Sequence, residues 1–170
     1  MAIIGSYQKI TPCLWFDSNA WDAVTFYTTV FNNSEKGKIS YYGPDMPLPQ
    51  GSVLTVQFQI EGQEFLALNG GPEFNFTEAI SFVINCDTQD EIDYYWNKLT
   101  EDGGEESECG WLKDKFGVSW QVVPRMLGEM ISGADAKKVN NVMQALMGMK
   151  KLDIDQLVAA NSDSPDVIKT

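Results

Sequence analysis

Few side chains of this 170-residue chain are suited to catalysis or metal binding, because it contains no histidine. Histidine is the commonest metal ligand and the commonest general base at neutral pH. Its absence excludes a serine hydrolase triad, a thiol–imidazole pair and a three-histidine zinc site. Sites built from oxygen ligands remain possible, because the chain has 24 aspartate and glutamate residues.

Three kinds of group remain as candidates: a thiol, a run of carboxylates and an amide. Cys13 could be a nucleophile, but no histidine or neighbouring lysine can activate its thiol, so we expect a buried and inert cysteine. Glu105, Glu106 and Glu108 could hold a cation, although a solvated edge strand accounts for such a run more simply. The amide is that of Gln121, and its surroundings depend on the strand that carries it.

The segment at residues 109–124, CGWLKDKFGVSWQVVP, is expected to form two short strands joined by a tight turn. Polar residues and a glycine make the turn, and β-branched and aromatic residues follow it. Because side chains alternate along a strand, Trp120 and Val122 point to one face while Ser119 and Gln121 point to the other. The first face can lie under a helix, which leaves the amide of Gln121 facing a cavity.

This hairpin closes the second of two segments that share one order, a strand, a helix and three strands. The first module is predicted at about residues 8–69 and the second at residues 79–124, with GGPEFNFTE as the linker. Helices are predicted from apolar residues at helical spacing, at residues 19–32, 88–101 and 134–150. Strands are predicted at residues 8–16, 39–42, 53–60, 65–69, 79–86, 105–109, 111–113 and 118–123.

We expect the two modules to form one domain at residues 1–124, followed by a helical extension and tail at residues 125–170. A helical turn at residues 126–131, the long helix and a short helix capped by Asp153 make up the extension. The polar tail after Asn161 is expected to be disordered. An apolar stripe on the long helix is typical of core or of a subunit interface, and its members are Val139, Val142, Met143, Leu146 and Met149.

The composition limits the partners and the location of the protein. A net charge of −12 and a pI near 4.2 repel nucleic acids and anionic membranes, so neither is expected as a partner. The N-terminal residues lack the order of a signal peptide and no apolar run is long enough to cross a bilayer, which favours a cytoplasmic protein. Three cysteines, Cys13, Cys86 and Cys109, suggest neither a disulfide framework nor a thiolate metal site.

Four stretches of the chain resemble one protein family: ITPCLWFDSNAWDAVTFYTTVF, ALNGGPEFNF, AISFVINC and CGWLKDKFGVSWQVVP. The resemblance is to the PhnB-like branch of the vicinal oxygen chelate superfamily, which also contains glyoxalases, bleomycin-resistance proteins and extradiol dioxygenases. Members of this branch are often called 3-demethylubiquinone-9 3-methyltransferase domains. A tail similar to MKKLDIDQLVAA recurs in the branch. The resemblance implies an α+β fold in which two βαβββ modules form a trough with the helices outside, plus a C-terminal helical tail.

If the apolar faces of the strands lie under the helices, strand parity selects the residues that line the trough. These candidate small-molecule-binding residues are Thr11, Cys13, Trp15, Phe65, Ala67, Asn69, Ser81, Val83, Ser119 and Gln121. Aromatic residues could add a pocket for a flat or apolar ligand, or could be ordinary core. They are Trp15, Trp111, Phe65, Phe74 and Phe76.

Metal-dependent members of the superfamily hold their ion with inward residues on four strands. The resemblance places these positions at Thr11, at Phe65 or Ala67, at Ser81 and at Gln121. One amide and two hydroxyls match a transition metal poorly in charge and softness, so we expect that the metal site is lost and that no cofactor is bound.

Two functions therefore remain as hypotheses. The first is a small-molecule-binding protein without metal that acts by sequestration or sensing. The second is an enzyme with a divergent site, a lyase, isomerase or oxidoreductase. Methyl transfer, which the family title suggests, is less favoured because the chain lacks a glycine-rich strand-to-helix turn followed by an acidic residue. The resemblance also implies a homodimer.

Overall fold

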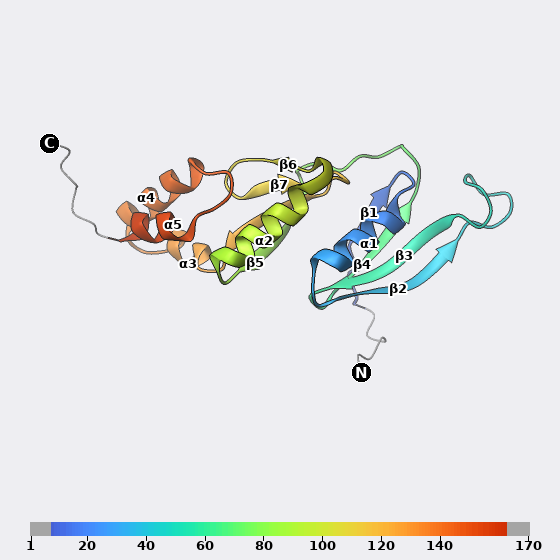
Figure 1. Cartoon of the computed structure of the whole chain (residues 1–170), viewed down its shortest axis with the longest axis horizontal. Helices are drawn as coiled ribbons and strands as arrows, with labels where there is room; N and C mark the ends of the chain where they lie inside the picture. The colour runs from blue at the N-terminus through green and yellow to red at the C-terminus, as the bar shows by residue number, and fades with distance from the viewer. Residues whose placement is uncertain (1–7, 163–170) are drawn as a thin grey trace. The chain divides into compact units, whose positions relative to one another are not determined.

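The structure, a computed structural model, describes residues 8–162 and divides the chain into two compact units (Figure 1). The first unit is residues 1–76 and the second is residues 77–170. The predicted disordered tail lies almost wholly outside the described residues. Each unit contains one mixed four-stranded sheet and is described by itself.

In the first unit the order strand, helix and three strands is confirmed. β1 pairs with β4 in parallel, and β4, β3 and β2 follow as antiparallel neighbours, so the sheet order is β1-β4-β3-β2. The elements are β1 Cys13–Phe16, α1 Ala20–Val30, β2 Ser34–Tyr41, β3 Val53–Ile60 and β4 Gln63–Asn69.

The second unit repeats this order and adds three helices. Its sheet order is β5-β8-β7-β6, again with one parallel pair, β5 with β8. The elements are β5 Phe82–Cys86, α2 Gln89–Thr100, η1 Glu101–Gly103, β6 Glu105–Glu106, β7 Trp111–Lys113, β8 Ser119–Pro124, α3 Leu127–Ile131, α4 Ala136–Met147 and α5 Ile154–Asn161. The predicted hairpin is therefore β7 and β8.

The helices predicted at residues 19–32, 88–101 and 134–150 are all present, one to three residues shorter at each end. Side-chain caps mark the starts of α2, α4 and α5, whereas Asn19 before α1 makes no side-chain cap bond. Thr88 accepts a hydrogen bond from the Glu91 amide at 3.2 Å, as the predicted capping box requires. Asp135 caps α4 and Asp153 caps α5 in the same manner.

Four strand predictions need correction. β1 begins at Cys13 rather than at residue 8, and β5 begins at Phe82 rather than at residue 79. β2 begins at Ser34 rather than at residue 39, because its polar, mostly exposed residues give no apolar alternation and its register shifts between Lys36 and Ile39. β6 ends at Glu106 rather than at residue 109, since the chain turns away from the sheet and the amide of Cys109 bonds to the carbonyl of Met149.

One helix covers one face of each sheet and makes the core there. In the first unit the buried ring of Tyr27 from α1 stacks on Phe58, which stacks on Phe65, at centroid distances of 6.0 and 5.1 Å. In the second unit α2 packs on β7 and β8 and buries Trp120 and Val122. Among residues 8–162, no helix of either unit covers the opposite face of its own sheet (Figure 1).

The apolar stripe on α4 mostly packs inside the helical extension. Val142 is completely buried in a cluster with Leu127, Leu152 and Leu157. Leu146 and Met149 pack against this cluster, whereas Met143 is exposed. The stripe is thus mainly the core of α3, α4 and α5, which leaves little of it for a subunit interface.

Candidate functional site

The parity prediction is confirmed on β1 and wrong on β4. Leu14 and Phe16 are buried under α1, while Cys13 is exposed and Trp15 is half-buried on the other face. On β4, however, the predicted trough residues Phe65, Ala67 and Asn69 are the buried ones.

Two contacts explain why these β4 residues face the helix. Phe65 belongs to the aromatic stack below α1, and the side-chain oxygen of Asn69 accepts a hydrogen bond from the Ala20 amide, 2.8 Å away, at the start of α1. The nitrogen of the same side chain donates to the carbonyl of Val53 at 3.0 Å. The open face of β4 therefore carries Glu64, Leu66 and Leu68.

The predicted aromatic pocket is dispersed in the first unit. The indole nitrogen of Trp15 donates to the Gly71 carbonyl at 2.9 Å, and the ring lies so close to Gly70 that a Cβ there would be 2.2 Å from it. Phe74 meets Trp15 edge-on at 5.0 Å, and Phe76 packs instead on Phe16 at 5.2 Å. The segment that follows β4 therefore fixes the ring of Trp15, and this ring does not line an open pocket.

Two of the three cysteines, Cys13 and Cys86, have a thiol pKa above the usual value. Cys13 is exposed rather than buried as predicted, yet partial burial of its thiol raises the pKa above the usual value. Burial, with the nearby carboxylates of Glu91 and Asp87, raises the pKa of Cys86 to about 12. Both thiols therefore stay protonated at neutral pH, which argues against a thiolate nucleophile. Thr11, the remaining candidate here, is exposed and donates to the carbonyl of Gln8.

In the second unit the predicted parity is confirmed on both strands that carry site candidates. Val83 is 49% exposed on β5, and its neighbour in register on β8 is Gln121. The Gln121 amide nitrogen donates to the hydroxyl of Ser81 at 2.9 Å. The open face of this sheet thus brings together three predicted residues, Ser81, Val83 and Gln121.

Ser119 is the unusual member of this face. Its side chain is only 2% exposed, and its hydroxyl oxygen has no hydrogen-bond partner among the described residues. Most buried hydroxyls in proteins are hydrogen-bonded, so an unpartnered one calls for an explanation. Parity placed Ser119 on this face, but its missing partner could not be read from the sequence.

A cavity of about 490 Å³ adjoins Ser119, β6 and β7. The ammonium of Lys113 lies 2.5 Å from a carboxylate oxygen of Glu78 there, an ion pair that the sequence analysis missed. Lys113 and Trp111 lie opposite Ser119 and Gln121 in the β7–β8 register. The side chains that line the cavity include Glu78, Glu105, Glu108, Trp111, Lys113 and Ser119.

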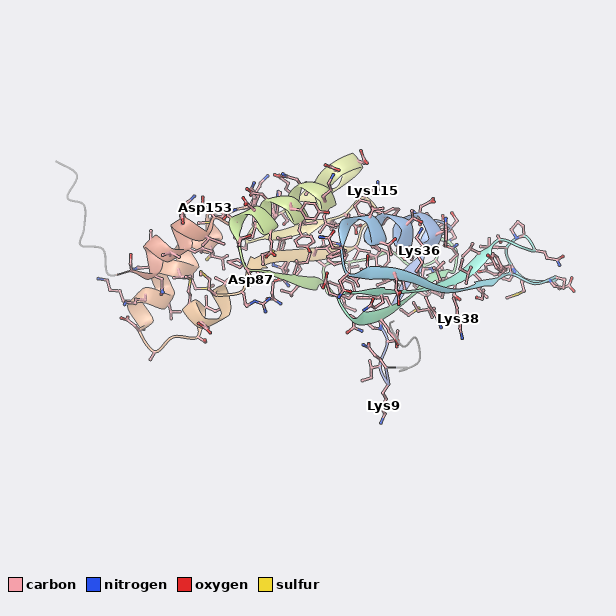
Figure 2. All side chains as sticks on the ribbon, turned by 60° about the horizontal axis from the view of Figure 1, so that its bottom comes forward. Lys9, Lys36, Lys38, Asp87, Lys115 and Asp153 are labelled. Carbon is pink, nitrogen blue, oxygen red and sulfur yellow. The ribbon has the colours of Figure 1, made fainter. Side chains whose placement is uncertain are left out.

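Asp114 holds the hairpin that presents these groups. One of its carboxylate oxygens accepts from the amides of Phe116 and Val118, at 2.9 and 3.1 Å, and the other accepts from the indole nitrogen of Trp120 at 2.8 Å. Gly117 completes the turn at a φ of 87°, which a side chain would disfavour. Figure 2 shows Lys115, in this turn, and Asp87, after β5, at opposite ends of the sheet.

The sequence and the fold are similar to those of known proteins. The family model described as 3-demethylubiquinone-9 3-methyltransferase matches residues 8–123. The chain belongs to this family. A PhnB protein of the family from Bacillus cereus is 38% identical over 69% of this chain and 99% of its own, with a TM-score of 0.63.

More distant solved structures share the fold of this family member. Protein PA1353 from Pseudomonas aeruginosa is 22% identical over 68% of this chain and 96% of its own, with a TM-score of 0.55. The fosfomycin resistance protein FosX from Listeria monocytogenes is 18% identical over 78% of this chain and 100% of its own, with a TM-score of 0.51. The fold is thus that of the vicinal oxygen chelate superfamily. No curated protein matches the chain.

The metal of the superfamily's enzymes does not fit the residues of this family member. Phe65 and Ala67 offer no donor atom and lie under α1, which leaves the hydroxyls of Thr11 and Ser81 and the amide of Gln121. The corrected parity adds one carboxylate, that of Glu64, to the open face of β4. This carboxylate accepts a hydrogen bond from the backbone amide of Gln8 at 3.2 Å. Within residues 8–162 no three aspartate, glutamate or cysteine side chains are grouped to hold an ion.

Proposed function

We propose that this family member is a small-molecule-binding protein that works without a metal ion and binds its ligand on the open face of the second sheet. Sequestration or sensing of the ligand is the proposed mode of action. The observation that carries the proposal is the unpartnered hydroxyl of Ser119 beside the cavity.

The unpartnered hydroxyl of Ser119 lowers the stability of the free protein. A buried hydroxyl without a partner costs about 1–3 kcal/mol, a penalty that apolar replacement would remove. Such a cost is expected at a binding site, where a ligand supplies the missing hydrogen bond. Ser119 is therefore interpreted as a group that recognises ligand rather than as a packing residue.

The neighbouring side chains support the same interpretation. Within residues 8–162 the amide oxygen of Gln121 stays available, because the hydrogen bond to Ser81 uses only the amide nitrogen. Trp111 presents a half-buried ring across from Gln121, and aromatic walls with a few placed polar groups are typical of small-molecule sites.

Ser119→Ala tests this function through two opposite effects. The variant is expected to raise the free energy of unfolding of the free protein by about 1 kcal/mol, which corresponds to roughly 2–4 °C in the midpoint. It should at the same time weaken the thermal stabilisation by any ligand found in a screen of small molecules against the wild type.

The matched control is Ser107→Ala, another lining serine, whose exposed side chain should leave stability unchanged. A Ser119→Ala variant that is less stable than the wild type and binds every screened ligand equally well would refute the proposal.

Assembly and location remain predictions of this proposal. A homodimer is still expected, but its contact surface lies elsewhere than on the buried part of the α4 stripe. No helix among residues 8–162 is long and apolar enough to span a membrane. A cytoplasmic location is retained as a prediction.

A further inference from the structure

The cavity beside Ser119 has an excess of negative charge. Four glutamates and one lysine line it. Lys113 is ion-paired with Glu78, and in the β6–β7 register it also lies opposite Glu105. Because the lining residues carry three more negative charges than positive charges, a cation that enters the cavity would be attracted.

The four lining glutamates differ in whether a cation or a hydrogen-bond donor already contacts the carboxylate. Glu106 accepts a hydrogen bond from the Trp96 indole nitrogen at 2.9 Å and lies 3.9 Å from the ammonium of Lys150. Within the described residues neither Glu105 nor Glu108 has an ion-pair partner, although the charge of Glu105 acts on the nearby Lys113. Glu105 and Glu108 are therefore the carboxylates with capacity for a further cation.

A row of exposed glutamates alone would be a solvated strand edge. Ser119 provides the independent observation. Ser119 is among the residues that line the same cavity, and its buried hydroxyl lacks a partner, so the cavity adjoins a polar group that a bound molecule can satisfy.

The dimensions and the lining favour an organic cation over a metal ion. No three carboxylates are grouped to coordinate an ion within residues 8–162, and a cavity of about 490 Å³ has room for a small organic molecule. The ring of Trp111 lines the cavity too, and an indole ring attracts both apolar groups and ammonium groups.

We propose that the ligand of this cavity is an organic amine, whose ammonium group is held by Glu105 and Glu108 while its body packs on Trp111 and a polar group bonds to Ser119. This inference rests on the proposed function and names its ligand class. The net charge of −12 favours the approach of such a ligand over any anion.

Three probes of the same shape and different charge test the inference: phenylpropylamine, phenylpropanol and phenylpropionate. Each is titrated into the full-length protein by calorimetry. Phenylpropylamine is expected to bind, with an affinity that falls as salt is added, and the other two are expected to bind at least about tenfold more weakly.

The double variant Glu105→Gln/Glu108→Gln should weaken phenylpropylamine binding by about tenfold and leave phenylpropanol binding unchanged. Glu35→Gln/Glu73→Gln is the matched control, because it makes the same charge change at exposed residues of the first unit. An equal loss in the control would show that only net charge matters and would overturn the inference.

Failure of the inference can be told apart from failure of the proposed function. Equal binding of all three probes that Ser119→Ala weakens would overturn the amine preference and leave the proposed function standing. Absence of phenylpropylamine binding to the wild type overturns the inference. A screen with no ligand sensitive to Ser119→Ala overturns the proposed function.

Discussion

Replacement of Asp114 by alanine is expected to destabilise the second unit by about 3–5 kcal/mol. Asp114 is 3% exposed, and its two carboxylate oxygens accept three hydrogen bonds, from two turn amides and from the Trp120 indole. Alanine would leave these donors without a partner around a buried hairpin. Urea denaturation followed by tryptophan fluorescence measures the loss as a lower midpoint.

Two variants control for the Asp114 result. Asp114→Asn keeps an oxygen for the turn amides but cannot accept from the indole through its nitrogen, so an intermediate loss of about 2 kcal/mol is expected. Asp90→Ala, at an exposed aspartate of α2, should change stability by less than about 0.5 kcal/mol. An Asp114→Ala protein as stable as the Asp90→Ala protein would contradict the role given to this carboxylate.

Val142→Asp is expected to unfold the helical extension, with a loss of about 4 kcal/mol or more. Val142 is completely buried among Leu127, Leu152 and Leu157, and no cationic side chain belongs to this cluster. An aspartate there would be a buried, unpaired charge. Circular dichroism should report a loss of helix in the variant.

Met147→Asp on the same helix is the control, because Met147 is 68% exposed. It should change stability by less than about 0.5 kcal/mol. A Val142→Asp protein that stays folded and only changes from a dimer to a monomer in sedimentation would contradict the packing of α4, and would restore its stripe as a subunit interface.

The order of the elements could be predicted because local signals define it. Thr88 and Glu91 mark the start of α2, and the turn residues around Gly117 mark the hairpin. The parity of β4 could not be predicted, since apolar residues occupy both faces: Phe65 and Ala67 on one, Leu66 and Leu68 on the other. Only the aromatic stack and the cap of α1 decide between these faces.

The candidate site was predictable where strand alternation alone places a residue. Ser81 and Gln121 lie on the open face for this reason, and they bond to each other. The ion pair of Lys113 with Glu78 and the unpartnered state of Ser119 depend on neighbours brought from separate segments. No periodic pattern reports such contacts, so the Glu105–Glu108 run was interpreted as solvent-exposed edge alone.

We propose that this site works without the metal ion of the superfamily's enzymes. The most direct test is the metal content of the purified protein by mass spectrometry, after incubation with nickel, zinc and manganese and removal of free ions. Because the donors left on the open faces are two hydroxyls, one amide and the carboxylate of Glu64, which already accepts from the Gln8 backbone amide, we predict a content far below one ion per chain. One tightly held ion per chain would contradict the account and favour an enzyme with a divergent metal site.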